Sequence, residues 1–197
     1  MRADTGKVAI KAVYSKACPT GGLRPALKVL IDRSEVDRRI GEMAREIATD
    51  YAGSAPLLIG ILNGAAQFMM ALLDRLPNEM LEQLDYDFVD VSSYRGSEST
   101  GRVELTKDLV VAVEGREVLV VDGIVDTGRS LAFVMELVRG RRPRSLKTCT
   151  LLDKSARRSV PLVVDYRGFE IEDVFVVGYG MDYDQRYRAL RHIAAIE

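Results

Sequence analysis

Histidine and cysteine are nearly missing from this chain of 197 residues, which contains one histidine and two cysteines. A histidine-based metal site is therefore excluded, because His192 has no second imidazole to join it. Cys18 and Cys149 lie far apart in the sequence and do not form the C-x-x-C spacing of zinc or redox motifs. We therefore expect a fold that needs neither a disulfide nor a structural metal.

Long apolar runs and an excess of one charge are also missing. No apolar run approaches the roughly 18 residues of a membrane-spanning helix, and the N-terminus lacks the apolar core of a signal peptide. The 28 lysines and arginines nearly balance the 29 aspartates and glutamates, so no global basic field attracts nucleic acid. These absences predict a cytoplasmic protein, in a reducing compartment, that binds neither membrane nor nucleic acid.

The composition that remains is that of a globular domain. Hydrophobic residues make up 47% of the chain, and a chain of this length buries roughly 70% of the surface that its unfolded form exposes. Apolar stretches of strand length alternate with amphipathic helical patterns, which favours an α/β fold with a central parallel sheet flanked by helices. We expect a single domain over residues 27–197, and residues 1–26 as an N-terminal extension.

The strands and helices are predicted from apolar patterns and their boundary residues. Ser34 and Asp37 indicate a capping box at the start of the first helix. Gly140 is expected to end the helix that begins near residue 131. The expected strands cover residues 28–31, 57–62, 84–94, 118–121, 146–152 and, as the last clear strand, 174–178.

The most informative stretch is VLVVDGIVDTGRSL, at residues 118–131. Its apolar start predicts a buried strand that ends at Asp122, and the residues that follow predict a loop opening onto a helix. The N-terminus of a helix presents unpaired N–H groups to an anion, and four residues of this loop suit a phosphate: Thr127, Gly128, Arg129 and Ser130. Asp126 lies in the same loop, where its negative charge would be unfavourable unless it took part in chemistry.

This stretch resembles the phosphoribosyl-diphosphate signature of the type I phosphoribosyltransferases. Three further segments match the hypoxanthine-guanine phosphoribosyltransferases in order and spacing: SSYRGSESTG at 92–101, LLDK at 151–154 and GFEIEDVFVVGYGMDYDQRYR at 168–188. The resemblance implies the type I phosphoribosyltransferase fold, in which the C-terminal part and the segment before the first helix form a small hood. It also implies purine salvage, a Mg²⁺-dependent transfer of ribose 5-phosphate from 5-phosphoribosyl 1-diphosphate to N9 of hypoxanthine or guanine, which gives IMP or GMP.

The resemblance assigns roles to the residues around the signature. It implies that Asp126 is the general base, which accepts a proton near N7 of the purine. The remaining residues of the segment would bind the phosphate and the ribose: Asp122, Gly123, Ile124, Val125, Thr127, Gly128, Arg129 and Ser130.

Residues outside the signature are assigned by the same resemblance. Lys154 would donate to O6 of the purine and so select a 6-oxopurine over adenine, and Val174, Phe175, Val176 and Asp182 would also line the purine site. Asn63, Gly64 and Arg188 would bind diphosphate. Asp182 and Asp122 would hold Mg²⁺. Residues 95–108 would form a mobile flap, with Ser93 and Tyr94 at its hinge.

The sequence departs from the family pattern at Gly123, where the family carries a second acid that binds the ribose hydroxyls. Losing such a hydrogen bond costs roughly 1.5 to 3 kcal/mol. Two alternatives stay open. One is an RNA-binding regulator with this fold, which would use the basic cluster Arg139, Arg141, Arg142 and Arg144, and the other is a nucleotide sensor without turnover, which Gly123 makes conceivable. The resemblance also implies a homodimer or homotetramer, and the choice among hypoxanthine, guanine and xanthine is open.

Overall fold

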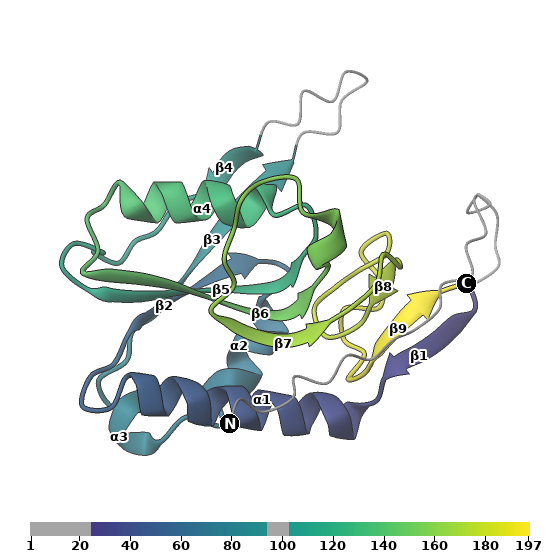
Figure 1. Cartoon of the computed structure of the whole chain (residues 1–197), viewed down its shortest axis with the longest axis horizontal. Coiled ribbons are helices and arrows are strands. Elements are labelled where there is room, and N and C mark those ends of the chain that lie inside the picture. Colours follow the sequence, from purple (N-terminus) through teal and green to yellow (C-terminus); the bar gives the residue numbers. More distant parts are fainter. Residues whose placement is uncertain (1–24, 94–102) are drawn as a thin grey trace.

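The computed structural model describes residues 25–93 and 103–197. A six-stranded sheet in the order β4-β3-β2-β5-β6-β7 forms its centre (Figure 1). All neighbouring strands are parallel except β4, which runs antiparallel to β3. The strands are β2 (Leu57–Leu62), β3 (Tyr86–Ser93), β4 (Val103–Lys107), β5 (Glu117–Val125), β6 (Ser145–Asp153) and β7 (Tyr166–Glu170). The predicted α/β fold with a central, mostly parallel sheet is confirmed.

Helices cover both faces of this sheet, which is why the inner strand β2 carries no polar side chain. Leu57, Ile59 and Val118 face one side and pack in a cluster with α4. Leu58 and Leu119 alternate with them and face the helices on the other side. Figure 1 shows α4 on one side of the sheet and α1, α2 and α3 on the other. The helices are α1 (Arg33–Asp50), α2 (Ala66–Leu73), α3 (Asn78–Leu81), α4 (Arg129–Arg139) and the 3-10 turn η1 (Ser155–Arg157).

Two of the predicted helix boundaries were tested by the structure. Gly140 is the C-terminal cap of α4, as expected. The capping box at Ser34 and Asp37 was wrong, because the first helix begins two residues earlier, with Asp32 as its N-cap. The Asp32 carboxylate accepts from the backbone N–H of Glu35 at 2.9 Å, which satisfies one of the unpaired donors of the first turn.

A second, smaller sheet forms the hood. It has the order β1-β9-β8 and is antiparallel throughout, with β1 (Leu27–Ile31), β8 (Val176–Val177) and β9 (Ile193–Ile196). The hood therefore joins the segment before the first helix to the C-terminal part, as the resemblance implied. Buried residues of the hood belong to the same apolar cluster as α1, so the two sheets share one core.

The strand prediction was wrong at three points. β5 does not end at Asp122 but continues to Val125, because Asp122 and Ile124 still pair with β6. The strand near residue 176 is not the last, since β9 follows it. β7 was not predicted at all. β7 and β9 are short and lack an alternating pattern, so that pairing with a neighbour, rather than their own sequence, determines their conformation.

The predicted flap also needs a correction. Residues 103–107 of the proposed loop form β4, whose register pairs Val103 with Ser93. Ser93 is the last residue of β3, while Tyr94 and the rest of the predicted flap up to residue 102 lie outside the described residues, as do residues 1–24 of the predicted extension.

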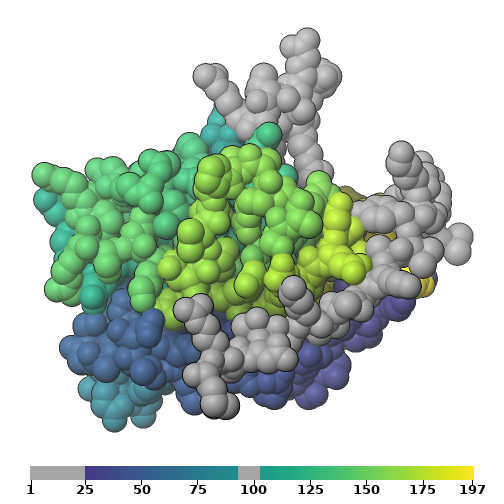
Figure 2. Space-filling model, in the orientation of Figure 1, coloured from purple at the N-terminus to yellow at the C-terminus, as the bar shows by residue number. Residues whose placement is uncertain are grey.

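The main layers can also be followed on the molecular surface. In the space-filling view, the yellow-green segment around β7 lies between the blue and purple layer of α1 and the green layer of α4 (Figure 2). Within the described ranges, no helix is both long enough and apolar enough to cross a lipid bilayer.

Candidate active site

The carboxyl ends of the parallel strands bring the predicted site residues to one edge of the sheet, where ligands of such folds bind. Asn63 and Gly64 directly follow β2. Asp126 directly follows β5, and Lys154 directly follows β6. The backbone N–H of Lys154 donates to the carbonyl of Val125 at 2.9 Å. The ends of β5 and β6 therefore hold Asp126 and Lys154 side by side.

The predicted phosphate loop opens directly onto α4. Gly128 is the N-cap of this helix and has a φ of 85°, a left-handed conformation that favours glycine. No side chain caps the helix, and Thr127 Oγ1 lies 3.5 Å from the N–H of Arg129, a long contact. The N–H groups of the first turn, with Ser130 among them, can therefore bind an anion at the positive end of the helix dipole.

Asp126 lies in a cluster of four charged groups. Its carboxylate is 2.8 Å from Nε of Arg157 and 3.9 Å from Nζ of Lys154. Asp173 is the second carboxylate, 2.8 Å from Arg157 and 3.9 Å from Lys154. The side chain of Asp126 remains 43% exposed, so a bound molecule can reach it.

Lys154 is the buried member of this cluster, with a side chain that is only 6% exposed. Burial lowers the pKa of Lys154, while the carboxylates of Asp126 and Asp173 act in the opposite direction. Both carboxylates attract the buried ammonium group from 3.9 Å, which is beyond hydrogen-bonding distance, so it can still donate to a ligand. Such a group suits hydrogen bonding to a carbonyl oxygen of a ligand.

An aromatic side chain stands beside the hood strand β8. Phe175 is 52% exposed, which is unusual for a phenylalanine and leaves its ring available to a planar ligand. Its ring meets that of Tyr183 edge to face, with the centroids 5.8 Å apart. The carbonyl of Phe175 accepts from Ile196, whereas Val174 donates to Glu172 and Val176 is buried within β8.

Asp182 and Arg188 form an ion pair in the turns between β8 and β9. A guanidinium nitrogen of Arg188 is 2.8 Å from one carboxylate oxygen of Asp182. The other oxygen accepts from the N–H of Gln185 at 2.9 Å. Arg188 also donates to the carbonyl of Gly180 at 2.8 Å. These contacts hold the turn of residues 180–188 together.

Asp122 is nearly buried, with 9% of its surface exposed. Burial raises the pKa of Asp122 to about 7, although the backbone N–H groups of Ile124 and Gly123 favour the charged form. No ion pair to Asp122 is found among the described residues. A cation or a ligand hydroxyl near this carboxylate would therefore stabilise its ionised form.

Three glycines bring the remaining segments together. A Cβ atom added to Gly123 would lie 2.4 Å from the carbonyl oxygen of Gly64, and one added to Gly180 would lie 2.2 Å from the same oxygen. The loop after β2 therefore packs between the end of β5 and the turn that carries Asp182 and Arg188. The structure thus gathers the predicted phosphate, purine and diphosphate residues around one edge of the sheet.

Sequence reasoning missed three residues of this site. Arg157 and Asp173 contact Asp126 and Lys154, as described above. Arg158 forms an ion pair with Asp153, which is buried, and its side chain packs against Gly128. The repeated arginine in SARRS, directly after LLDK, was a signal that could have indicated Arg157 and Arg158. No pattern in the sequence indicated Asp173.

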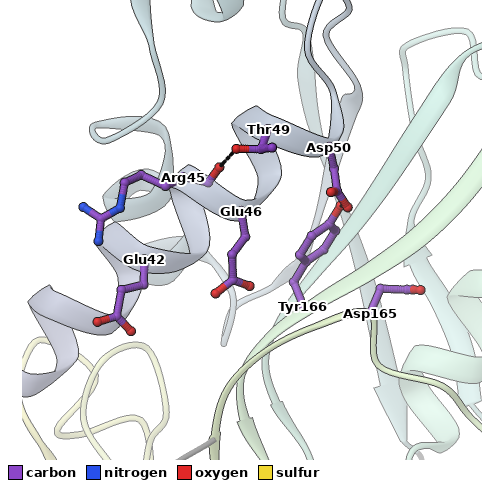
Figure 3. Close-up of a pocket in the computed structure, with 7 residues that line it drawn as sticks. All are labelled: Glu42, Arg45, Glu46, Thr49, Asp50, Asp165 and Tyr166. Carbon is purple, nitrogen blue, oxygen red and sulfur yellow. Dashed lines mark hydrogen bonds between the residues drawn. The ribbon is translucent and has the colours of Figure 1, made fainter. Parts of the chain in front are cut away.

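A separate pocket lies at the opposite end of the sheet (Figure 3). It is formed by the C-terminal half of α1 and the beginning of β7, where the hydroxyl of Tyr166 donates to Asp50 at 2.6 Å. None of the predicted site residues borders it. The residues that line it are Glu42, Arg45, Glu46, Thr49, Asp50, Asp165 and Tyr166.

Comparison with known proteins identifies the class to which this fold and site belong. Residues 31–184 match the phosphoribosyl transferase domain model. The chain therefore belongs to the phosphoribosyltransferase family.

Individual relatives of the chain indicate a narrower group within this family. Over 171 residues the chain is 42% identical to the hypoxanthine-guanine phosphoribosyltransferase of Bacillus subtilis, with 86% of this chain and 93% of the relative covered. It is 46% identical over 171 residues to the bifunctional protein TilS/HprT of Listeria monocytogenes, and covers only 26% of that longer protein. A crystal structure of a hypoxanthine-guanine phosphoribosyltransferase from Bacillus anthracis aligns with a TM-score of 0.80 at 35% identity and covers 89% of this chain and 100% of that one. The resemblance to this group of enzymes is confirmed.

Proposed function

We propose that the chain transfers ribose 5-phosphate from 5-phosphoribosyl 1-diphosphate to N9 of hypoxanthine or guanine, and so forms IMP or GMP in purine salvage. The observation that carries the proposal is the placement of Asp126 and Lys154, 3.9 Å apart, directly beside the helix N-terminus of the phosphate loop. An acceptor and a fixed donor next to an anion site suit a purine that reacts with a sugar phosphate. The similarity to enzymes with this activity supports the same conclusion.

The reaction exchanges one bond at C1′ of the ribose for another. The bond from C1′ to the diphosphate oxygen breaks, the bond from C1′ to N9 forms, and the purine gives up one proton. Asp126 accepts that proton near N7 and balances the positive charge that develops on the purine ring. The N–H groups of the first turn of α4 hold the 5′-phosphate, together with Thr127 and Ser130, and so place the ribose for attack.

Purine selection rests on the buried ammonium group of Lys154. It donates to O6 of hypoxanthine or guanine, whereas the amino group of adenine offers no acceptor there. Asp173 and Asp126, each 3.9 Å from Nζ, favour the charged form of this donor. The exposed ring of Phe175 covers one face of the purine, and the backbone beside Val174 and Val176 borders its edge.

The diphosphate group of the donor is bound by Asn63, Gly64 and Arg188. Mg²⁺ binds through one or two carboxylates together with substrate phosphates, and Asp182 and the nearly buried Asp122 supply oxygen ligands of this kind. When bound, Mg²⁺ would neutralise negative charge on the departing diphosphate. The raised pKa of Asp122 fits this proposal, because a carboxylate that lacks a cationic partner gains most from a nearby cation.

A spectrophotometric assay with the diphosphate donor and Mg²⁺ tests the proposal. We expect turnover of hypoxanthine or guanine, and none of adenine. Asp126→Asn should lower kcat by about 10²-fold or more, while the KM for the donor changes by less than about threefold. Asp74→Asn serves as the matched control, because Asp74 is an exposed carboxylate at the end of α2. If kcat were the same in Asp126→Asn and Asp74→Asn, Asp126 would not be the general base.

The RNA-binding alternative receives less support. Its four candidate arginines each face a carboxylate: Arg139 faces Glu136, Arg141 faces Asp108, Arg142 faces Glu114 and Arg144 faces Glu117. These pairs reduce the positive potential that a phosphate backbone would require.

Two further predictions are part of the proposal. A homodimer or homotetramer would be recognised by its sedimentation rate in analytical ultracentrifugation. A cytoplasmic location is predicted from the sequence and is tested by fractionating the cells that make the protein.

A further inference from the structure

Glycine is required at position 123 for a steric reason and not because of its backbone conformation. Gly123 is not among the glycines with a positive φ, so an ordinary residue could adopt its conformation. What excludes a side chain is the Gly64 peptide, because a Cβ atom at Gly123 would lie 2.4 Å from the Gly64 carbonyl oxygen and 2.8 Å from its carbon. Both contacts are with backbone atoms, which cannot rotate away as the tip of a side chain can.

Gly180 contacts the same carbonyl group from the hood. A Cβ atom there would lie 2.2 Å from the Gly64 oxygen and 3.1 Å from its carbon. The carbonyl of Gly180 accepts from Arg188, and its N–H donates to the Arg188 carbonyl at 2.9 Å. The Gly64 peptide is therefore enclosed between the ribose end of β5 and the turn that orients Arg188.

We propose that Gly123 and Gly180 are positioning residues, which seat the Asn63-Gly64 loop so that it and Arg188 bind diphosphate together. This inference rests on the proposed function, because it assigns diphosphate to that loop. The second acid of the family pattern would not fit this arrangement, because the Gly64 carbonyl occupies the space of its Cβ atom. In this chain, close backbone packing at the diphosphate loop replaces a carboxylate contact to the ribose.

The family pattern alone predicts that Gly123→Asp improves donor binding, because the restored carboxylate would accept from a ribose hydroxyl and lower the KM for the donor. The contact with Gly64 predicts the opposite. The added Cβ atom requires the Gly64 oxygen to move by about 1 Å, because ordinary contacts begin at 3.4 Å. A misplacement of about 1 Å at a binding group can cost as much as 10²-fold.

Steady-state kinetics and calorimetric titration with diphosphate decide between these expectations. For Gly123→Asp and Gly123→Ala we expect a KM for the donor and a Kd for diphosphate that rise about tenfold or more. The KM for hypoxanthine should change by less than about threefold, because the proposed function assigns this loop to diphosphate and not to the purine. Gly180→Ala should show the same pattern from the hood side, with a further loss of stability because alanine is strained at the φ of 98° that Gly180 adopts. Gly41→Ala is the control, since a Cβ atom there lies 3.9 Å from its nearest neighbour, in ordinary contact.

The outcomes separate this inference from the proposed function. An active wild type with an unchanged or lower donor KM in Gly123→Asp would overturn the positioning role alone. Equal increases in the KM for the donor and for hypoxanthine would also overturn it, because they would indicate general damage to the site. If none of the three site variants folded, as judged by circular dichroism against Gly41→Ala, the contact would serve folding only and the positioning role would be refuted. A wild type that neither turns over nor binds diphosphate would overturn both.

Discussion

Replacing Asp122 by asparagine should stabilise the ligand-free protein at alkaline pH. Asparagine has nearly the same shape and can still accept from the N–H groups of Gly123 and Ile124, but it carries no charge. Burial raises the pKa of Asp122 from its usual 3.8 to about 7. The folded chain therefore holds this carboxyl as the neutral acid at a pH where the unfolded chain has already ionised it.

The direction of the pH dependence follows from the number of protons bound at residue 122 in the folded and the unfolded state. Between pH 3.8 and about 7 the folded state binds more protons than the unfolded state at this position, so the free energy of unfolding falls as the pH rises. Above the folded pKa the loss is complete, and at 1.36 kcal/mol for each pH unit it amounts to about 4 kcal/mol. Asparagine has no such loss. The stability advantage of Asp122→Asn over the wild type should therefore grow by about 4 kcal/mol from pH 4 to pH 8.

Urea denaturation at a series of pH values measures this difference. Every other titrating group is common to both proteins and cancels from the comparison. Asp182→Asn is the control, because the Asp182 carboxylate is paired with Arg188 and 27% exposed, and its loss should not stabilise the protein at high pH. If the stability difference between Asp122→Asn and the wild type were constant across the pH range, Asp122 would not be held neutral by burial.

Three other substitutions or measurements test the remaining parts of the site. Lys154→Met should lower kcat/KM for hypoxanthine by about ten- to a hundredfold, since a hydrogen bond from a charged donor is worth roughly 1.5 to 3 kcal/mol. Initial rates measure this ratio, and an unchanged value would show that Lys154 does not recognise the purine. Gly128→Ala should lower the melting temperature and weaken donor binding, because alanine is strained at a φ of 85° and its Cβ atom would lie 2.9 Å from Cδ of Arg158; a variant with wild-type stability and donor KM would contradict this. RNA mobility-shift assays should show no complex at physiological salt, because the four arginines of the basic cluster all face carboxylates; a complex that weakened steeply with salt would favour the regulatory alternative.

Local patterns in the sequence were sufficient for the inner part of the fold. Runs such as LLIGIL in β2 are buried on both faces, and such runs are typical of a parallel sheet between two helical layers. The apolar spacing of α4 was equally clear. Short strands such as β9 were missed because IAAI has no distinctive pattern, and its conformation depends on its pairing with β1 and β8.

The candidate site, too, was predictable in part from local sequence and in part only from the tertiary structure. The sequence by itself indicated a phosphate site with a carboxylate beside it, because the glycine and hydroxyl residues around Asp126 lie between a buried strand and a helix. Its resemblance to the phosphoribosyltransferases supplied the class of reaction. The tertiary structure alone decided which groups face one another: Arg157 and Asp173 beside Asp126 and Lys154, and the Gly64 carbonyl against Gly123. Those contacts join segments that are far apart in the chain, so their distances follow from packing between elements, which no local pattern of residues encodes.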